Sequence, residues 1–418
     1  MLNCWRLTLI LRQTAATEPC WSHKVLRLAA NAPVFSPIYV TAGFSSKYEA
    51  TRRYDYAEVR RTSMGCEIDR DASGLHSLQG LAGRDVSVAA GAKVGWSFMG
   101  TGTIATELVV EAIRSVGHSP LWVVSRSKRD ADHFAEDLGI PHSTTELGPV
   151  LQDPSVGFAY ISASLKRRPH YITAAAGAGK HILCDGPISC TSKTASALVE
   201  LCRGARASLV VNQRLRASTI HQTMRRLVRD GDIGAVQSIV LIRGGPYQAP
   251  PNRSARDFND GSGIYLDVSV ENIDLARFLT GAEPVEATAL ITSEKMVPSQ
   301  ATYILRLSDG SLFQAHESFR TADIESMVLV AGDRGALIAQ GTLNGRTSGT
   351  LMRRADGRNE AVPVRDHDVH LATVREFANT RGQTPSWLSQ GTDSVIALRT
   401  VEAVAMSAKK RRTVPIQG

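Results

Sequence analysis

A run of small residues between Gly100 and Ala105 could bind the phosphates of a nucleotide. The run reads Gly-Thr-Gly-Thr-Ile-Ala and follows a short apolar stretch. Gly100 would permit a tight turn, Gly102 would let the backbone approach a pyrophosphate, and Ala105 would allow close packing of a helix on a strand. The N–H groups at the start of that helix attract anions. We therefore predict a dinucleotide-binding turn made by Gly100, Gly102, Thr103 and Ile104.

The next apolar run ends at Val124, a position that commonly selects between the two nicotinamide dinucleotides. Enzymes selective for NAD usually have Asp or Glu there, bound to the ribose 2′-hydroxyl. This chain has Ser125, Arg126, Ser127 and Lys128 instead. Hydroxyls and a guanidinium suit a 2′-phosphate. We therefore expect NADP as the cofactor, with NAD as the second candidate, and expect Ser125, Arg126 and Lys128 to bind it. Alternatively, Arg126 is a solvated residue at a helix start.

Three side chains that could exchange a proton lie close together further along the chain, namely Tyr265, Asp267 and Glu271. The two acids are four residues apart, so they share one face of a helix predicted over 266–279. Two close carboxylates raise the pKa of one of them, which suits an acid or base working near neutral pH. The alternative is that both acids only stabilise the N-terminus of the helix.

Several polar residues could bind a substrate because they follow predicted strands or lie in a long loop. Arg168 follows the third apolar strand, whereas Asn212 and Arg214 follow the last strand of the same alternating series. Ligands of parallel sheets bind beyond the carboxyl ends of the strands. Asn252 and Arg253 lie in a polar loop that could cover the site. His367 and His370 are three apart, but no further ligand pattern accompanies them, so we predict no metal site.

Strands alternating with helices must position the first group of these residues. This alternation predicts a parallel, doubly wound sheet with right-handed crossovers. The strands are expected at 94–99, 121–124, 158–162, 181–184 and 209–211, and the helices at 104–116, 128–138, 169–178 and 192–203.

The pattern changes after residue 213, where strands follow one another through short turns and so predict an antiparallel sheet. Its strands are expected at 236–243, 287–291, 302–307, 312–316, 326–331 and 336–339, with helices at 217–229, 266–279, 369–379 and 392–409. The predicted fold class is α/β, with a dinucleotide-binding Rossmann domain at 91–213. An α+β domain with a large, mainly antiparallel open sheet follows at 214–418. It would bind substrate, form a homo-oligomer (a dimer or tetramer) through its apolar open face, and pack its last helix back on the Rossmann domain.

Residues 1–90 lack sustained periodicity and are expected to be a poorly ordered N-terminal extension. They could be a targeting peptide, a disordered arm, or sequence upstream of a natural start near Met64. Nine lysines and arginines against four acids give residues 1–63 a charge of +5 out of the net +8 of the chain. The remainder is nearly balanced, which argues against a nucleic-acid partner.

Composition places the 418-residue chain among ordinary globular proteins, with 43% hydrophobic and 21% charged residues. No apolar run reaches the roughly 18 residues that a membrane span needs, so no membrane partner is expected. The six cysteines show neither metal-ligand nor paired spacing. We therefore expect free thiols and a cytoplasmic location.

The segment from Lys93 to about Ile416 resembles the glucose–fructose oxidoreductase / inositol 2-dehydrogenase (Gfo/Idh/MocA) family. The motifs are the Gly100 turn, A-G-K-H-I-L-C-D-G-P ending at Pro187, G-D-I-G at 231–234, and D-V-S-V-E-N-I-D at 267–274. The resemblance implies an NAD(P)-dependent oxidoreductase that transfers hydride between a nicotinamide cofactor and a sugar, polyol or related carbonyl or alcohol. It also implies that Asp185 and Pro187 lie at the cofactor, with a cis peptide before Pro187.

Two departures from the family pattern concern proton transfer. Where the family has Glu-Lys-Pro, with the lysine on the reacting oxygen, this chain has Asp185, Gly186 and Pro187. Where the family has its acid/base histidine, this chain has Glu271. We therefore predict Glu271 as the acid/base, with Asp267 and Tyr265 as further catalytic residues. The alternative is a catalytically degenerate protein that binds a dinucleotide or sugar in a regulatory or sensor role.

Overall fold

The computed structural model describes residues 94–101, 104–246, 263–294, 297–322, 324–343, 349–381, 383 and 386–417. The N-terminal extension predicted at 1–90 lies outside these residues. So do four of the predicted site residues, Gly102, Thr103, Asn252 and Arg253. Ile104 lies in a helix, but its side chain is not among those described.

Within the described residues, seven strands form the first sheet, in the order β15-β6-β5-β4-β1-β2-β3. Neighbouring strands from β6 to β3 are parallel, and β15 joins the β6 edge antiparallel. The predicted doubly wound parallel sheet is confirmed. The strands are β1 (Gly95–Met99), β2 (Ser119–Val124), β3 (His142–Thr144), β4 (Val156–Ile161), β5 (His181–Asp185), β6 (Leu209–Asn212) and β15 (Ser389–Gln390).

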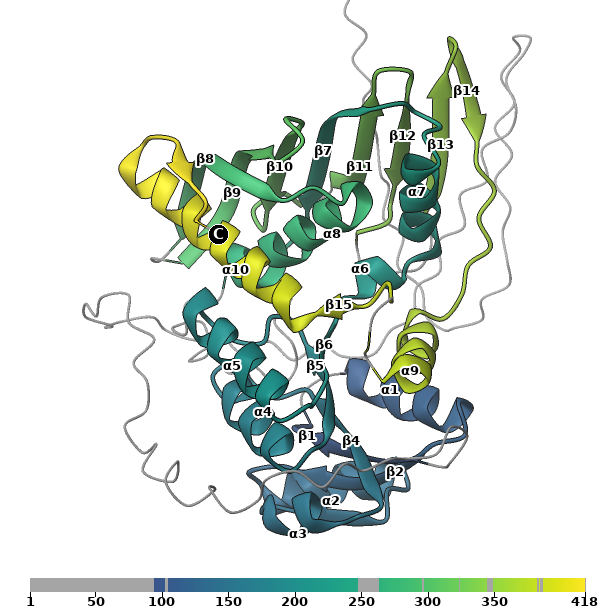
Figure 1. Ribbon diagram of the computed structural model, residues 1–418, viewed down its shortest axis with the longest axis vertical. Coiled ribbons are helices and arrows are strands. Elements are labelled where there is room, and N and C mark those ends of the chain that lie inside the picture. The colour runs from purple at the N-terminus through teal and green to yellow at the C-terminus, as the bar shows by residue number, and fades with distance from the viewer. Residues whose placement is uncertain are drawn as a thin grey trace, which may run out of the picture. The chain divides into compact units, whose positions relative to one another are not determined.

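Helices cover both faces of this sheet (Figure 1). They are α1 (Ile104–Ser115), α2 (Lys128–Asp137), α3 (Gly148–Gln152), α4 (Arg168–Gly177) and α5 (Ser192–Gly204), joined by α9 (Val369–Thr380) from later in the chain. Because successive side chains of a strand point to opposite faces, β1 sends Trp96 and Phe98 to the side of α1 and α9, where Trp96 packs edge-on against Phe158. Met99 points to the opposite core.

The second sheet has nine strands among the described residues, in the order β14-β13-β12-β11-β7-β10-β9-β8-β16. All neighbouring pairs are antiparallel except β7 with β10. This confirms the predicted large, mainly antiparallel sheet. The strands are β7 (Val236–Gly244), β8 (Pro284–Glu294), β9 (Val297–Leu307), β10 (Leu312–Ser318), β11 (Ile324–Gly332), β12 (Gly335–Gln340), β13 (Thr350–Ala355), β14 (Arg358–Ala361) and β16 (Val414–Pro415).

The remaining helices pack on one face of the second sheet or link it to the first. They are α6 (Arg214–Ala217), α7 (Thr219–Arg229), α8 (Val270–Thr280) and α10 (Gly391–Lys410), with a π-helix, η3 (Tyr265–Ser269), directly before α8. Helix α10 packs against both α5 and β8, so the last helix does contact the Rossmann helices. The helix predicted at 266–279 is confirmed, and its first turn is π-helical.

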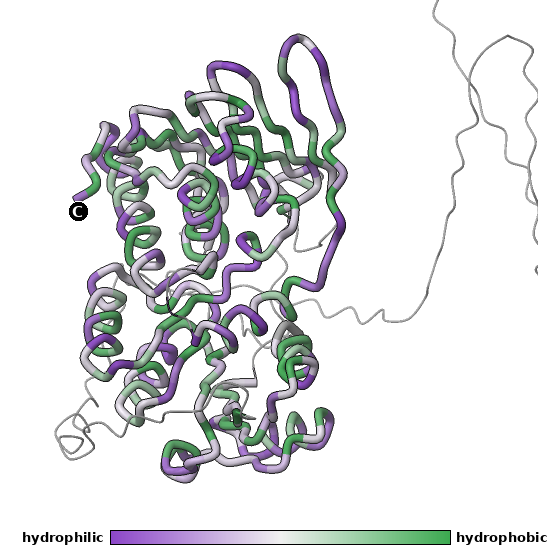
Figure 2. Tube along the Cα trace, turned by 45° about the vertical axis from the view of Figure 1, so that its right-hand side comes forward, coloured by the Kyte–Doolittle hydropathy of each residue, from purple (hydrophilic) through white to green (hydrophobic). Residues whose placement is uncertain are grey.

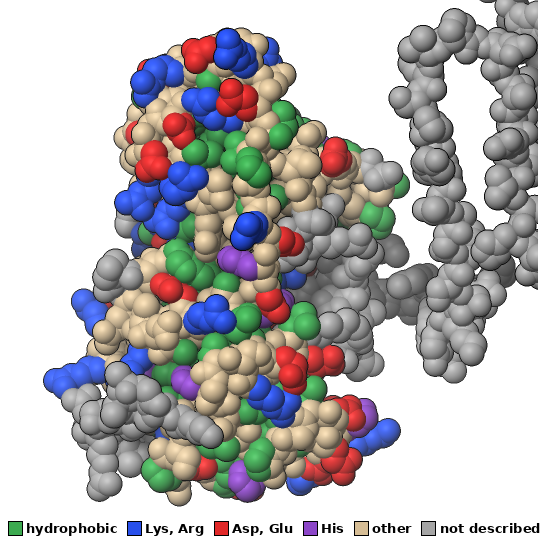
Figure 3. Space-filling view, turned by 90° about the vertical axis from the view of Figure 1, so that its right-hand side faces the viewer, with side chains coloured by type: hydrophobic (Ala, Val, Ile, Leu, Met, Phe, Trp, Pro, Cys, Tyr) green, Lys and Arg blue, Asp and Glu red, His purple; other side chains and the backbone are tan. Residues whose placement is uncertain are grey.

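Hydropathy and charge follow this layering. Green, hydrophobic stretches run along the strands and their packed helices in Figure 2, whereas the outer β13–β14 hairpin is mainly purple. Basic and acidic side chains are interspersed on the face drawn in Figure 3, as the near-balance of charge beyond residue 63 predicts. No helix in the described ranges is long and apolar enough to cross a membrane.

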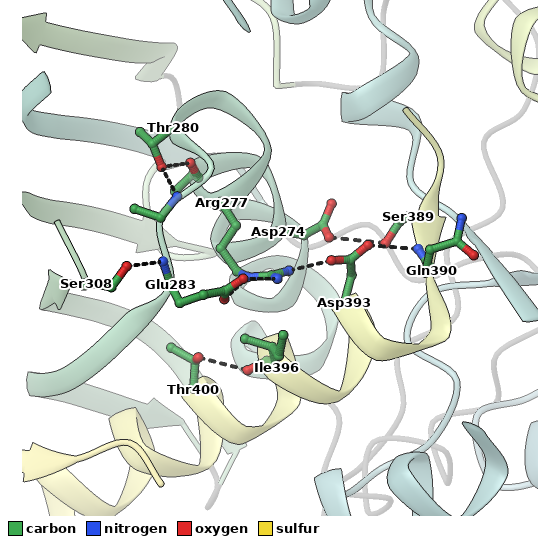
Figure 4. A network of polar contacts seen from close by, with 12 residues as sticks. Asp274, Arg277, Thr280, Glu283, Ser308, Ser389, Gln390, Asp393, Ile396 and Thr400 are labelled. Carbon is green, nitrogen blue, oxygen red and sulfur yellow. Dashed lines mark hydrogen bonds and ion pairs between the residues drawn. The ribbon is translucent and has the colours of Figure 1, made fainter. Parts of the chain in front are cut away.

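A buried ionic network joins α6, α8 and α10. The Arg216 guanidinium binds Asp274 through two hydrogen bonds of 2.7 Å, and Arg216 and Asp274 are 7% and 1% exposed. Asp393 forms an ion pair with Arg216 at 3.2 Å and accepts a hydrogen bond from Arg277 at 2.9 Å. Figure 4 shows Arg277 between Glu283 and Asp393, with Ser389 donating to Asp274. The Rossmann sheet edge and the helices of the second sheet therefore share one set of paired charges.

His221 on α7 is a second buried link. Its Nδ1 lies 2.8 Å from the Leu215 carbonyl oxygen and its Nε2 lies 3.0 Å from Thr342 Oγ1. The ring therefore donates through Nδ1 and accepts through Nε2, which is the neutral form. Burial lowers the pKa of His221 to about 4, although the bond to Leu215 opposes part of this effect.

We expect the free energy of unfolding to fall as the pH drops from about 6.5 towards 4. The unfolded chain takes up a proton on His221 near its ordinary pKa of 6.5, whereas the folded chain does so only near 4. Protons then favour the unfolded state, by about 3 kcal/mol once the pH is below both values. Urea unfolding at several pH values measures this loss.

The matched control is His221→Gln, which retains a donor and an acceptor but cannot titrate. Its free energy of unfolding should be lower at neutral pH and should depend less on pH between 6.5 and 4. A variant with the same pH slope as the original protein would exclude His221 as the cause.

Candidate active site

The turn after β1 is shaped so that only glycine fits at position 100. Gly100 has φ +102°, and its N–H donates to the Val124 carbonyl oxygen at 2.8 Å. A Cβ there would lie 2.7 Å from the Ser162 carbonyl oxygen and 2.8 Å from the Ala163 backbone. The turn therefore lies between the carboxyl ends of β1, β2 and β4, where the strand order reverses and parallel α/β sheets bind ligands.

Helix α1 begins at Ile104, immediately beyond this turn. The N-terminus of this helix, with its positive dipole end, lies at the switch point of the sheet, which suits a pyrophosphate. The close backbone approach at Gly100 and the helix that follows fit a dinucleotide. Among the residues predicted to bind the cofactor, Gly100 and the start of α1 therefore lie together at this point of the sheet.

The residues after β2 have distinct environments. Ser127 caps α2 by accepting from the Asp130 N–H at 3.2 Å. Lys128 forms an ion pair with Asp132 and donates to Ser143, so its ammonium group is already engaged. Ser125 is half-buried, whereas Arg126 is exposed and has neither a hydrogen bond nor an ion pair to the described residues. Among the three predicted residues, Arg126 is the cation available to a phosphate.

The carboxyl ends of β4, β5 and β6 carry a polar cluster that sequence analysis recognised only in part. Tyr160 donates to Asp185 Oδ1 at 2.7 Å, and Asn212 Nδ2 donates to the same oxygen at 3.2 Å. Burial and the neighbouring carboxylate raise the pKa of Tyr160 well above its ordinary value, so the phenol remains a donor. Asp185 and Asn212, predicted for different ligands, therefore belong to one cluster. Tyr160 was missed because it lies inside an apolar strand.

The loop after β5 contains a cis peptide between Gly186 and Pro187, as the family resemblance implied. A Cβ at Gly186 would lie 3.1 Å from both Gln213 Nε2 and Val211 Cγ1. A larger residue at 186 would thus require these side chains to move. Arg168 donates to the Pro187 carbonyl oxygen at 2.6 Å and to the Ala163 carbonyl oxygen at 3.0 Å. Arg168, which was predicted to bind substrate, thus forms hydrogen bonds to both the loop after β4 and the loop after β5.

The predicted catalytic residues lie where η3 passes into α8. Asp267 Oδ2 accepts from the Gly263 N–H at 3.3 Å, whereas Glu271 Oε2 accepts from Arg243 at 3.0 Å. The two carboxylates therefore have different partners. Tyr265 is half-buried, and burial together with the charge of Glu317 raises its pKa, which keeps its hydroxyl protonated. Such π-helical turns occur often at functional sites.

Behind this turn lies a buried carboxyl group, Glu317 on β10, that the sequence analysis missed. It accepts from Ser269, from Asn272 Nδ2 at 2.8 Å and from the Tyr303 hydroxyl at 2.7 Å. Burial raises the pKa of Glu317. The available signal was an acid at an inward-facing strand position, in line with the buried Phe313 and Ala315.

Arg243 on β7 connects this carboxyl group to Glu271. Besides its bond to Glu271, its Nη1 donates to Asn272 Oδ1 at 3.3 Å. Asn272 in turn donates to Glu317. One hydrogen-bonded chain therefore runs from the core of the second sheet to the predicted acid/base. Arg243 was not among the predicted site residues, because nothing near it in sequence indicates the pairing.

Arg214 begins α6 and is half-buried near His370 on α9, whose pKa is lowered first by burial and then by the charge of Arg214. His367 Nε2 lies 2.7 Å from the Ala217 carbonyl oxygen. Asn252 and Arg253 lie outside the described residues. Among those that are described, no cluster of three or more metal-ligating side chains occurs.

Two protein-family models match the chain, one over the first sheet and one over most of the second. Residues 94–213 match the family described as "Oxidoreductase family, NAD-binding Rossmann fold", and residues 221–338 match the GFO/IDH/MocA C-terminal domain. The chain is 29% identical over 332 residues to a 1,5-anhydro-D-fructose reductase of Ensifer adhaerens, covering 77% of this chain and 98% of that one. It is 26% identical over 321 residues to a D-xylose 1-dehydrogenase (NADP(+)) 2 of Haloferax volcanii, covering 75% and 97%.

Solved structures agree in fold. An aldose-aldose oxidoreductase from Caulobacter crescentus complexed with glycerol has a TM-score of 0.70 at 22% identity, covering 78% of this chain and 100% of that one. A levoglucosan dehydrogenase in complex with NADH has a TM-score of 0.67 at 18% identity, with coverage of 78% and 100%. With its Rossmann switch-point turn, its open sheet and matches to both domains, this chain belongs to the GFO/IDH/MocA family of NAD-binding oxidoreductases.

Proposed function

We propose that the chain interconverts a CH–OH group of a sugar or polyol and the corresponding carbonyl, with NADP as its cofactor and NAD as the second candidate. The Gly100 turn carries the proposal, because its backbone packing and the start of α1 provide a dinucleotide site. Relatives named as a 1,5-anhydro-D-fructose reductase and a D-xylose dehydrogenase support this substrate class.

Arg126 is the main support for NADP. It stands directly after β2, is exposed, and has no partner among the described side chains. A free guanidinium can bind a phosphate through two parallel hydrogen bonds. Lys128 would contribute mainly charge, because Asp132 and Ser143 already occupy its ammonium group. Ser125 would add a hydroxyl.

The catalytic assignment rests on the Glu271–Arg243 pair. The bound dinucleotide supplies the acceptor or donor of the hydride. In the oxidation direction, the carbinol carbon loses a hydride and the hydroxyl loses a proton, which Glu271 accepts. Arg243 holds Oε2 of Glu271 and leaves Oε1 for the substrate hydroxyl. Tyr265 and Asp267 then serve as hydrogen-bonding groups beside the reacting oxygen.

The remaining predicted residues complete the proposed site. Asp185 and Pro187 would line the nicotinamide part of the cofactor site. Arg214 and the loop residues Asn252 and Arg253 would bind the hydroxyl groups of the substrate, with Arg168 and Asn212 beside them. Among the described residues, Cys184 and Cys202 are outside any disulfide, which supports the proposed cytoplasmic location.

We also propose that two or more copies associate through the second sheet. Among the described elements, helices pack on one face of this sheet. The other face carries Ile304 and Leu312, which are 44% and 41% exposed. Leu329 on β11 pairs across strands with Val240 and Ile338, which extends this apolar surface. Exposed apolar side chains on a sheet face that no described helix covers favour an interface.

Glu271→Gln should lower kcat by about 10²- to 10⁴-fold, the contribution typical of a general acid or base. The dissociation constant of NADPH should change less than threefold, because Glu271 lies on α8 and not at the Gly100 turn. Absorbance at 340 nm with sugars, ketoses and inositols measures kcat. Glu200→Gln, an exposed position on α5, is the control. Full turnover in Glu271→Gln would refute its assignment.

Arg126→Ala should weaken NADP binding by about 10- to 100-fold and leave NAD binding nearly unchanged, because only NADP carries the 2′-phosphate. Fluorescence titration gives both dissociation constants. Arg129→Ala, also exposed at the start of α2, is the matched control. Equal losses for the two cofactors would count against a 2′-phosphate contact.

Ile304→Lys combined with Leu329→Lys should convert an oligomer into a monomer, because charges on an apolar interface lose their hydration without a partner. Light scattering coupled to size-exclusion chromatography gives the mass in solution. Met406→Lys, an exposed position on α10 at 41%, is the control. An unchanged oligomer mass would exclude this face as the interface.

A further inference from the structure

Two buried polar atoms near the proposed site have no hydrogen-bond partner. They are Oδ1 of Asn212 and Nδ1 of His370, on side chains 7% and 8% exposed. Buried polar atoms in folded proteins nearly always have a partner. An unpaired acceptor and an unpaired ring nitrogen therefore point to a ligand that supplies the missing bonds.

Both atoms belong to the carboxyl edge of the Rossmann sheet. Asn212 is the last residue of β6 and donates to Asp185 at the end of β5. His370 lies in the first turn of α9, which packs against α6. Its electrostatic neighbours are Arg214 on α6, Asp185 on β5 and Asp368 in its own helix cap. Asp185, one residue before the cis Gly186–Pro187 loop, is thus hydrogen-bonded to Asn212 and acts electrostatically on His370.

The hydrogen bonds of the cluster determine what Asn212 can offer. Asp185 Oδ1 accepts from the Tyr160 hydroxyl and from Asn212 Nδ2, so the amide nitrogen of Asn212 must face Asp185. Its Oδ1 is left as an acceptor. Burial lowers the pKa of His370, with a smaller effect of Arg214 in the same direction and opposing effects of Asp368 and Asp185. The imidazole is therefore neutral at pH 7 and can donate through Nδ1.

With the proton on Nδ1 of His370, a ligand group that satisfies both atoms donates one hydrogen bond and accepts another. A primary carboxamide does this with its N–H and its carbonyl oxygen. The nicotinamide ring of a dinucleotide carries such a group. In a doubly wound sheet the cofactor lies beyond the carboxyl ends of the strands next to the switch point, the edge that Asp185 and Asn212 close.

We propose that Asn212 and His370 bind the carboxamide of the nicotinamide, Asn212 Oδ1 accepting from its N–H and His370 Nδ1 donating to its carbonyl oxygen. This inference rests on the proposed function and adds to it a recognition site for the reactive ring. Because the carboxamide is fixed to that ring, holding it sets the rotation of the ring. It thereby sets which face of the ring meets the substrate. Asn212 thus becomes a cofactor residue rather than a substrate residue.

A ligand that lacks only the amide nitrogen tests the inference. The 3-acetylpyridine analogue of NADPH replaces the carboxamide NH₂ by a methyl group and retains the carbonyl. Full-length protein should bind NADPH about tenfold more tightly than the analogue. Asn212→Ala should weaken NADPH binding by a similar factor and leave the analogue almost unchanged, so the ratio approaches one. His370→Phe should weaken both ligands, since both retain the carbonyl.

Asn379→Ala on α9 and His170→Phe on α4, both exposed, are the matched controls and should change neither dissociation constant. NADH and its 3-acetylpyridine analogue are titrated in parallel, so that the result does not depend on whether the protein prefers a dinucleotide with or without the 2′-phosphate. Equal affinity of the original protein for NADPH and its analogue would overturn the inference without any variant.

Other outcomes separate this inference from the proposed function. If the original protein binds neither dinucleotide, the proposed function fails. If it binds NADPH tightly and the variants lose only affinity for a sugar or polyol, the unpaired atoms serve the substrate and the carboxamide assignment is wrong.

Discussion

The candidate site depends on the buried ion pair between Arg216 and Asp274. Arg216 follows β6 by four residues, and Asp274 lies three residues after Glu271, so one contact relates the edge of the Rossmann sheet to the predicted acid/base. Removing one partner of such a pair leaves an uncompensated charge in the interior, which lowers the free energy of unfolding by about 3–5 kcal/mol. Asp393 and Arg277 extend the pair to α10. This ion pair therefore helps to fix the distance between the carboxyl edge of the Rossmann sheet and Glu271, because separating the two buried charges costs much free energy.

The departures from the family pattern each come with a compensating partner. Glu271 stands in place of a histidine and pairs with Arg243. In the same turn, the hydroxyl of Ser269 donates to the buried Glu317. Gly186 leaves room that the side chain of Gln213 occupies. Together these pairings describe a rearranged polar site, which favours retained chemistry over the degenerate alternative.

Much of the fold could be predicted from the sequence because the signals are local. Periodicity predicted strands β1, β2, β4, β5 and β6 and helices α1, α2, α4 and α5, and the handedness of crossovers predicted a doubly wound sheet. The short elements β3, α3 and β15 were not predicted. Strands β13 and β14 were missed, since an edge hairpin of arginines and acids shows no clean alternation. Glu317 was missed for a different reason. Its partners Ser269 and Asn272 lie 48 and 45 residues away, and no local pattern reports such a contact.

The same reasoning explains why the positions of candidate residues could be predicted but not their partners. A motif fixes which strand end a residue follows, so Asp185 and Asn212 could be placed at the carboxyl edge of the Rossmann sheet. Hydrogen bonds between distant segments decide which of their atoms are already used. Asp185 Oδ1 and Glu271 Oε2 are occupied by Tyr160 and Arg243, respectively, whereas Asn212 Oδ1 remains unpaired. A ligand can therefore bind only those polar atoms that are left without a hydrogen-bond partner inside the protein, and folding determines which atoms these are.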